Sequence, residues 1–295
     1  MNKDFLTPVK ETPYTYTQPS NYFKGDLNPV EKRYVTRSVC IDTLFRPNYD
    51  GTSSTDFMYD FPENYKNIVS MKVTAIELPI AWYDFSCDRK NNFFTIPTVS
   101  KTIKIPDGNY DDTDMIKTLS FALQDTPIEF NIDSATAKCI FTSSSEFELS
   151  FAVDSIDLYQ TMGWNLGFRK ESYTSIKIGN VWTIISESSY GAAFDNYLFL
   201  EIDDFQRNFI TDSIISVIKP NKGYIGKNII ARIPFSTSYN IINSNDSNCL
   251  FKAREYLGPV RLEKLRIRLL NRFGEVISMN QNDYSIMIEF VQLFS

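Results

Sequence analysis

The chain contains 295 residues and carries a net charge of −6, with 30 Lys and Arg against 36 Asp and Glu. That length allows one large β domain or two ordinary domains, and the 43% hydrophobic and 22% charged residues are typical of a globular protein. Histidine is absent, which excludes Ser-His-Asp triads, Cys-His pairs and His-ligated metals. The composition therefore favours a soluble, β-rich protein that is not an enzyme.

The cysteines and the N-terminal residues indicate in which cellular compartment the protein folds. Cys40, Cys87, Cys139 and Cys249 form no C-x-x-C pair, so we expect free thiols in a reducing compartment, with neither zinc nor another cofactor. The first ten residues lack the apolar segment of a secretory signal, and no apolar run reaches the ~18 residues that would span a bilayer.

Residues 1–33 differ from the rest of the chain. They combine four prolines with aromatic residues and show no apolar periodicity, which favours an extended conformation. Two interpretations stay open: a disordered tail, or an arm whose aromatic side chains anchor it on another subunit. The candidate anchors of the arm are Tyr14, Tyr16, Tyr22 and Phe23.

After residue 33 the apolar residues recur as they do in β-strands. Two late segments, 262–270 and 284–294, predict strands deep in a sheet. In residues 68–80 the apolar positions change parity between Val73 and Ile76, which predicts either a bulge or a strand buried on both faces.

Only two segments show a helical period. The first is 113–124, with Asp112 or Thr113 as its N-cap. The second is 156–162, which we expect to end at Gly163.

Many short strands separated by turn residues indicate an all-β fold of antiparallel, jelly-roll-like β-sandwiches with one or two short helices. We divide the chain into an N-terminal arm, 1–33, and a β-sandwich body, 34–295. Two subdomains, at about 34–155 and 156–295, are left open.

Basic residues concentrate near the C-terminus. Residues 252–272 contain seven basic and two acidic residues in an otherwise acidic chain. This basic stripe is compatible with a nucleic-acid site, a solvated strand face, or complementarity to an acidic protein surface. The negative net charge argues against binding to phosphates, so we expect a protein partner and no nucleic acid. The predicted contact residues are Arg254, Arg261, Lys264, Arg266 and Arg268.

Two acidic clusters invite a chemical interpretation. Asp107, Asn109 and Asp111 begin like an EF-hand loop, but its Gly at position 6 and Glu at position 12 are missing, so a turn before a helix is preferred. Asp203 and Asp204 could serve glycoside hydrolysis, but no feature fixes their separation from another acid, and a strand-end turn is preferred. We assign no catalytic, cofactor-binding or metal-binding residue.

Several segments are distinctive in their order along the chain. They are 37–47 (RSVCIDTLFRP), 77–79 (ELP), 91–93 (NNF), 105–110 (IPDGNY), 162–169 (MGWNLGFR), 197–205 (YLFLEIDDF), 256–260 (YLGPV) and 283–285 (DYS). In this order they resemble a family of minor capsid or penton-type virion proteins of large, nucleus- and cytoplasm-replicating double-stranded DNA viruses that infect algae and protists. The resemblance extends over residues 34–295.

The resemblance implies a non-enzymatic structural protein in or beneath an icosahedral capsid, located in the virion after assembly in the host cytoplasm. Its implied partners are the major capsid protein and other minor capsid proteins. Homo-oligomerisation, proximity to an internal virion membrane, and a position at the vertex, under the facets or at their seams stay open. The alternative is a glycan- or receptor-binding attachment protein, which would expose an aromatic platform on one sheet face.

The physics of residues 162–169 indicates a packing element. Gly163 is expected to end the short helix, Trp164 and Phe168 to enter an apolar space, Gly167 to permit close backbone approach, and Arg169 to bind a carboxylate. A ligand pocket around Trp164 is the alternative. The predicted structural residues are Gly163, Trp164, Gly167, Phe168, Arg169, Gly258 and Pro259.

Deletion of residues 1–30 is expected to leave the melting midpoint of the body unchanged and to abolish incorporation into particles. The reason is that four prolines and an aperiodic apolar pattern cannot build a core. Thermal unfolding and the composition of purified particles measure the two effects. If the truncated chain unfolds, the arm belongs to the protein's own core and its assembly role is wrong.

Overall fold

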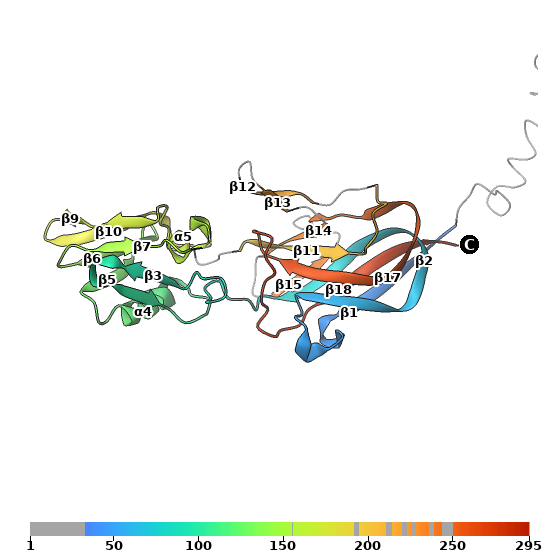
Figure 1. Cartoon of the computed structure of the whole chain (residues 1–295), viewed down its shortest axis with the longest axis horizontal. Helices are drawn as coiled ribbons and strands as arrows, with labels where there is room; N and C mark the ends of the chain where they lie inside the picture. Colours follow the sequence, from blue (N-terminus) through green and yellow to red (C-terminus); the bar gives the residue numbers. More distant parts are fainter. Residues whose placement is uncertain are drawn as a thin grey trace, which may run out of the picture.

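The structure is a computed structural model that describes residues 33–154, 156–191, 195–210, 214–219, 223–225, 228–235, 239–243 and 250–294. It shows two lobes side by side, both built mainly of antiparallel strands (Figure 1). The predicted all-β fold class is confirmed. The described residues contain no helix with the length and apolarity needed to cross a membrane. The four arm anchors and Cys249 lie outside the described residues.

Two large hydrophobic cores define the lobes, and a third, small cluster of Phe199, Ile229 and Leu270 belongs to strands of the first lobe. Residues 41–82 and 198–290 together build one core, and this part is called the first lobe. Residues 85–190 build the other core and are called the inserted lobe. The chain therefore leaves the first lobe, completes the inserted lobe, and returns.

The cores do not divide at residues 155 and 156, where the sequence suggested a boundary between subdomains. Phe151 and Met162, on either side of that point, are both fully buried in the core of the inserted lobe. A sequence pattern shows where strands begin and end, but it does not show which strands share a core.

The first lobe is one sheet of eight strands in the order β1-β18-β2-β17-β11-β14-β16, with β15 also paired to β2. The strands are β1 (Tyr34–Asp42), β2 (Asp56–Pro79), β11 (Tyr197–Asp203), β14 (Ile229–Pro234), β15 (Tyr239–Asn243), β16 (Leu250–Phe251), β17 (Arg254–Leu270) and β18 (Ser285–Leu293). The sheet curves around its own core (Figure 1). A separate hairpin joins β12 (Ser216–Lys219) to β13 (Gly223–Ile225).

The long strand β2 contains the irregularity expected from its sequence. Ala75 pairs with Met287 and Val73 with Ile288, which leaves Thr74 as an extra residue on β2. This bulge restores the inward direction of the apolar side chains, so Val73 and Ile76 are both fully buried. The predicted late strands are also confirmed, because β17 and β18 both pair on two sides.

The inserted lobe is a sandwich of two four-stranded sheets, β5-β6-β10-β9 and β4-β3-β7-β8. Phe94 on β3 meets Phe141 on β6, with ring centroids 5.6 Å apart, and so joins the two sheets. The strands are β3 (Phe93–Ile96), β4 (Lys101–Lys104), β5 (Ile128–Ile132), β6 (Lys138–Ser143), β7 (Glu148–Ser150), β8 (Ser172–Thr174), β9 (Ile176–Ile178) and β10 (Val181–Ser189).

The first expected helix is present as α4 (Asp112–Ala122), but its cap lies one residue earlier than predicted. Asp111 has an extended backbone and its carboxylate accepts a hydrogen bond from the Asp114 N–H. Met115 and Leu119 are fully buried and attach the helix to the core of the inserted lobe.

The second expected helix is broken into two short turns, η5 (Leu158–Gln160) and α5 (Met162–Asn165). The prediction that Gly163 ends this helix is wrong, because Gly163 lies inside α5. A Cβ at Gly163 would lie 2.3 Å from the Phe151 ring, so glycine is required here for packing. The left-handed residue is Gly167 instead, with φ +90°.

Gly167→Ala is expected to destabilise the protein by about 3 kcal/mol, since a Cβ there combines an unfavourable φ with a steric clash. The clash is with the Ser188 carbonyl oxygen, which lies 2.2 Å from the point that the new Cβ would occupy. Urea unfolding followed by tyrosine and tryptophan fluorescence measures the loss.

Gly179→Ala is the matched control, because Gly179 has φ +62° but no atom within 4 Å of a Cβ. Its cost should be limited to about 1 kcal/mol of backbone strain. Equal losses in the two variants would show that close approach to Ser188 is not what requires Gly167.

Candidate protein-interaction site

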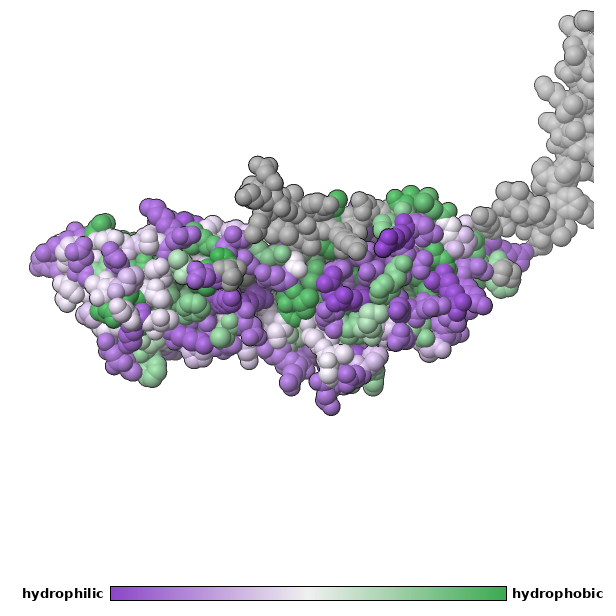
Figure 2. All heavy atoms as spheres, in the orientation of Figure 1, coloured by the Kyte–Doolittle hydropathy of each residue, from purple (hydrophilic) through white to green (hydrophobic). Residues whose placement is uncertain are grey.

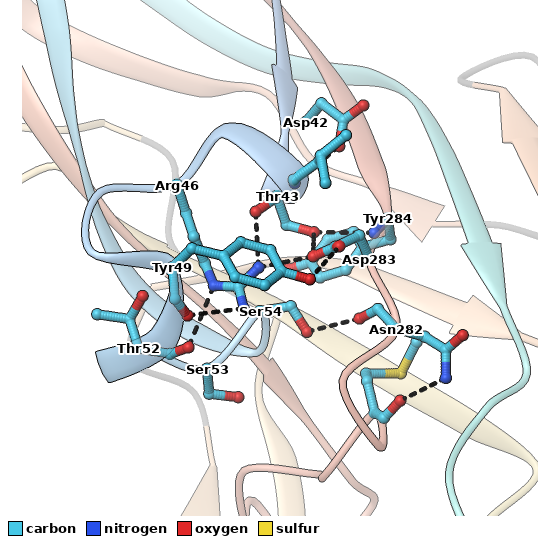
Figure 3. Close-up of polar contacts among 12 residues, drawn as sticks. Asp42, Thr43, Arg46, Tyr49, Thr52, Ser53, Ser54, Asn282, Asp283 and Tyr284 are labelled. Atoms are coloured by element: carbon cyan, nitrogen blue, oxygen red, sulfur yellow. Dashed lines mark hydrogen bonds and ion pairs between the residues drawn. The ribbon is translucent and has the colours of Figure 1, made fainter.

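The connection between β1 and β2, residues 43–55, is fixed by an arginine that reaches across the lobe. Arg46 is 7% exposed. Its Nη1 lies 2.6 Å from Oδ1 of Asp283, which immediately precedes Tyr284 and strand β18. Figure 3 shows the two side chains pointing toward each other between the β1–β2 loop and the segment before β18.

The remaining donors of Arg46 bind backbone carbonyls of the same loop. Nη1 donates to the Thr43 carbonyl at 2.8 Å, Nη2 to the Tyr49 carbonyl at 3.2 Å, and Nε to the Thr52 carbonyl at 3.1 Å. The guanidinium carbon also lies 3.8 Å from the centroid of the Tyr49 ring. Only the planar fork of arginine satisfies so many acceptors from one position.

Asp283 is held from three sides. Besides Arg46, it accepts hydrogen bonds from the Thr43 hydroxyl at 2.9 Å and the Tyr49 hydroxyl at 3.0 Å. The Thr43 hydroxyl oxygen in turn accepts from the Tyr284 N–H at 2.9 Å, and burial raises the pKa of the Tyr284 phenol. We call these five residues the Arg46 cluster (Figure 3).

The Arg46 cluster holds two apolar side chains out of the protein. Thr43, Leu44 and Phe45 form a single 3₁₀ turn, whose N-cap Asp42 accepts a hydrogen bond from the Leu44 N–H at 2.9 Å. Thr43 points inward and is buried, whereas Leu44 is 51% and Phe45 78% exposed. The loop that carries these two exposed apolar side chains is thus fixed by buried ionic contacts.

The basic stripe lies on β17, but most of its charges are paired within the chain. Arg266 forms two hydrogen bonds with Asp56, at 2.9 and 2.8 Å, and these raise its pKa. Arg268 contacts Glu201 at 2.6 Å. Both residues thus tie β17 to neighbouring strands.

Arg254 of the predicted stripe is buried, at 3% exposure. It lies 3.0 Å from the Asp204 carboxylate, which also accepts a hydrogen bond from the Tyr256 hydroxyl. Burial, and then the charge of Asp204, raise the pKa of the Tyr256 phenol, so this phenol stays a proton donor.

Arg261, Lys264 and Arg266 are the predicted contact residues that are exposed, and of these Arg266 is already bound to Asp56. Arg261 pairs with the exposed Glu263 at 3.0 Å, and the Lys264 ammonium lies 5.0 Å from the centroid of the Phe205 ring. The role of the stripe in partner binding stays a prediction, and these two residues are the ones placed to serve it.

The acidic residues considered for catalysis have structural partners. Glu201 and Asp204 are each buried beside an arginine, and Asp203 accepts a hydrogen bond from the Phe205 N–H at 2.9 Å. Each carboxylate therefore completes an ion pair or a turn.

The loop that begins like an EF-hand is also used structurally. Asp107 accepts from the Cys87 N–H at 2.9 Å, and Asn109 bridges the Asp84 N–H and the Trp82 carbonyl. Asp111 caps α4. The described part of the chain has no cluster of three Cys, Asp or Glu arranged to hold a metal. Cys40, Cys87 and Cys139 are free thiols.

The 162–169 segment packs as a structural element, and besides Gly163 it differs from the prediction at Arg169. Phe168 is fully buried and stacks on Phe151, with centroids 4.8 Å apart. The guanidinium of Arg169 binds an aromatic ring and carbonyls where a carboxylate was expected. It lies 4.1 Å from the centroid of the Trp164 ring and donates to the Trp164 and Phe168 carbonyls. The arginine therefore covers Trp164, where the alternative placed a ligand pocket.

Gly258 and Pro259 lie in β17, where its pairing with β2 shifts between Glu255 and Val260. Proline has no N–H to donate, and a bulge is where a strand tolerates it. Leu257 is 73% exposed at this bulge.

A polar hollow of about 450 Å³ lies where the two lobes meet. Its lining mixes Arg89 and Lys90 with Asp88, Asp107 and Glu275. Because both signs of charge are present, the lining does not specify an anionic or a cationic ligand.

Exposed aromatic residues do not gather on one sheet face. Among the described residues, Phe45, Tyr49, Tyr83 and Phe205 lie outside the strands, Tyr34 lies on β1, Phe294 follows β18, and Phe121 lies on α4 of the inserted lobe. On the face seen in Figure 2, hydrophobic residues form separate patches among hydrophilic ones. The platform expected of a glycan-binding sandwich is not found in this part of the chain.

Comparison with known proteins gives matches at the level of structure. No family model matches the sequence, and no curated protein matches it. The structure is similar to the mavirus penton protein, with a TM-score of 0.42 and 12% identity, over 89% of this chain and 100% of that one. It is also similar to a chain of the Sputnik virophage structure, with a TM-score of 0.41 and 13% identity, over 89% of this chain and 98% of that one.

Arg46→Lys is expected to destabilise the protein by about 2 kcal/mol, because lysine keeps the charge but leaves carbonyls of the loop without a donor. Urea unfolding measures this loss. Chymotrypsin cleavage after Phe45 should accelerate at the same time, as the loop loosens. Arg261→Lys is the control, since its exposed pair with Glu263 is worth less than about 1 kcal/mol. Unchanged cleavage in Arg46→Lys would show that the cluster does not fix the loop.

Proposed function

We propose that this chain is a structural component of an icosahedral virus capsid, a minor capsid protein that contacts major capsid capsomers and other minor capsid proteins. The Arg46 cluster is the observation that supports this function. It joins two segments that carry the family resemblance, 37–47 and 283–285, and it holds Leu44 and Phe45 in solvent. A loop fixed before binding loses little conformational entropy when it binds, which favours a stable contact.

The surface chemistry supports a protein partner. Phe45 supplies apolar area for a contact, and the exposed Lys264 on β17 supplies positive charge that would attract an acidic protein surface. The arm, residues 1–33, remains a second proposed contact with a neighbouring subunit. The chain would act in the virion after assembly in the host cytoplasm, without enzymatic activity.

Phe45→Asp is expected to reduce incorporation into particles by at least about tenfold, because a charge replaces the apolar side chain at the centre of the contact. Tagged chains would be expressed during infection by the virus that encodes this protein. The ratio of tagged chain to major capsid protein would then be measured in purified particles by mass spectrometry.

Phe121→Asp is the matched control, because Phe121 is 71% exposed on α4, outside the first lobe. Both variants should keep the wild-type melting midpoint, since neither side chain is buried. Absence of the wild-type chain from purified particles would refute the capsid role. Normal incorporation of Phe45→Asp would remove this loop from the contact.

A further inference from the structure

Strand β1 is a long, regular sheet edge. It is the outermost strand of the first lobe and pairs only with β18 among the described strands. The pairing runs from Tyr34↔Leu293 to Asp42↔Ser285 without a bulge. By comparison, the edge strands β16, β9, β8, β4 and β5 are two to five residues long.

The outward backbone groups of β1 can be assigned. The Phe294 N–H donates to the Arg33 carbonyl at 2.8 Å, and the Thr43 N–H donates to the Tyr284 carbonyl at 2.9 Å. Odd-numbered residues of β1 therefore face β18. In an antiparallel ladder the direction alternates along the strand, so even-numbered residues turn their N–H and C=O groups outward. These residues are Tyr34, Thr36, Ser38, Cys40 and Asp42.

The edge lacks most of the features that keep exposed strands from pairing. Natural edges are usually short, or protected by charged side chains, above all lysine, by proline or by a bulge, and of these β1 has only Arg37 and Asp42. Strand β1 has nine residues, none of them lysine or proline, and its pairing is continuous. Side chains on both faces are exposed over its first half, including Tyr34 at 58% and Val35 at 38%. The edge is therefore suited to accept another strand.

We propose that β1 binds β1 of a second copy of this chain, antiparallel and centred on Ser38, so that two first lobes share one continuous sheet. Such a contact is two-fold symmetric and uses the same surface on both copies. Thr36 then lies opposite the partner's Cys40, and Tyr34 opposite the partner's Asp42.

The length of the overlap selects this register, and charge excludes the neighbouring one centred on Arg37. The only charged residues of β1 are Arg37 and Asp42. Centring on Ser38 overlaps the whole strand and places Arg37 opposite the partner's Val39. Moving the centre by one residue to Arg37 would oppose two arginines, which is unfavourable. A second copy thus supplies a strand of matching length with no like charges opposed.

Charge variants at the centre test the pairing in the full-length chain. Sedimentation velocity should show a dimer for the wild type. Ser38→Lys and Ser38→Glu should each weaken dimerisation by about tenfold, because like charges meet at the symmetry axis. Mixing the two variants should restore dimers, with one copy of each. A contact elsewhere on the surface would not respond in this reciprocal way.

Cross-linking tests the register. In a background of Cys40→Ser, Cys87→Ser and Cys249→Ser, Ser38→Cys should form a disulfide-linked dimer on mild oxidation, since paired residues lie about 5.5 Å apart at Cα. Lys177→Cys, exposed on β9, should form no disulfide-linked dimer in the same background.

A monomeric wild type would overturn the proposal, whether the edge is then covered by residues 1–32 or by a different capsid protein. A dimer that ignores the Ser38 variants would overturn it equally. The capsid role is tested separately. If a Ser38→Lys chain that no longer dimerises still enters particles, the dimer contact is not needed for assembly and the capsid function is unaffected.

Discussion

Strand β2 is the element on which the first lobe depends. It pairs with β18 along one edge and with β17 and β15 along the other, over 24 residues. The β1–β2 loop leads into its start, and the inserted lobe follows its end. The bulge at Thr74 keeps the apolar side chains of β2 directed inward along this length. The positions of the exposed loop, of the paired strands and of the inserted lobe therefore all depend on β2.

The local features of this fold could be predicted from the sequence, whereas the long-range ones could not. The parity change in 68–80 predicts the bulge at Thr74, and the stripe of Met115 and Leu119 predicts α4. Both depend on residues close together in the chain. The prediction that Gly163 ends a helix was wrong, because glycine is required there by the Phe151 ring. That ring is distant in sequence, so no local pattern reveals the contact. The anchors of the arm lie outside the described residues.

The candidate site was predicted only in part, for the same reason. The segments that contain Arg46 and Asp283 were singled out, but nothing in either one indicates that they meet. Likewise, the basic stripe was visible as a run of charges, whereas its partners Asp56, Glu201 and Asp204 come from other strands. A run of basic residues on one strand shows where positive charge is placed, but it does not show whether carboxylates on neighbouring strands neutralise that charge.

The connectivity of the lobes imposes an order on synthesis. The inserted lobe draws only on residues 85–190 for its core, so it can fold while the rest of the chain is still on the ribosome. The first lobe cannot close until β18 emerges, because β1 pairs with it from Tyr34↔Leu293 onward. The Arg46 cluster needs Asp283, which lies just before β18, and therefore forms only near the end of synthesis. Chains that end before residue 283 lack that carboxylate and cannot fix the Phe45 loop, so under the proposed function the fold itself would keep such incomplete copies out of contacts made through this loop.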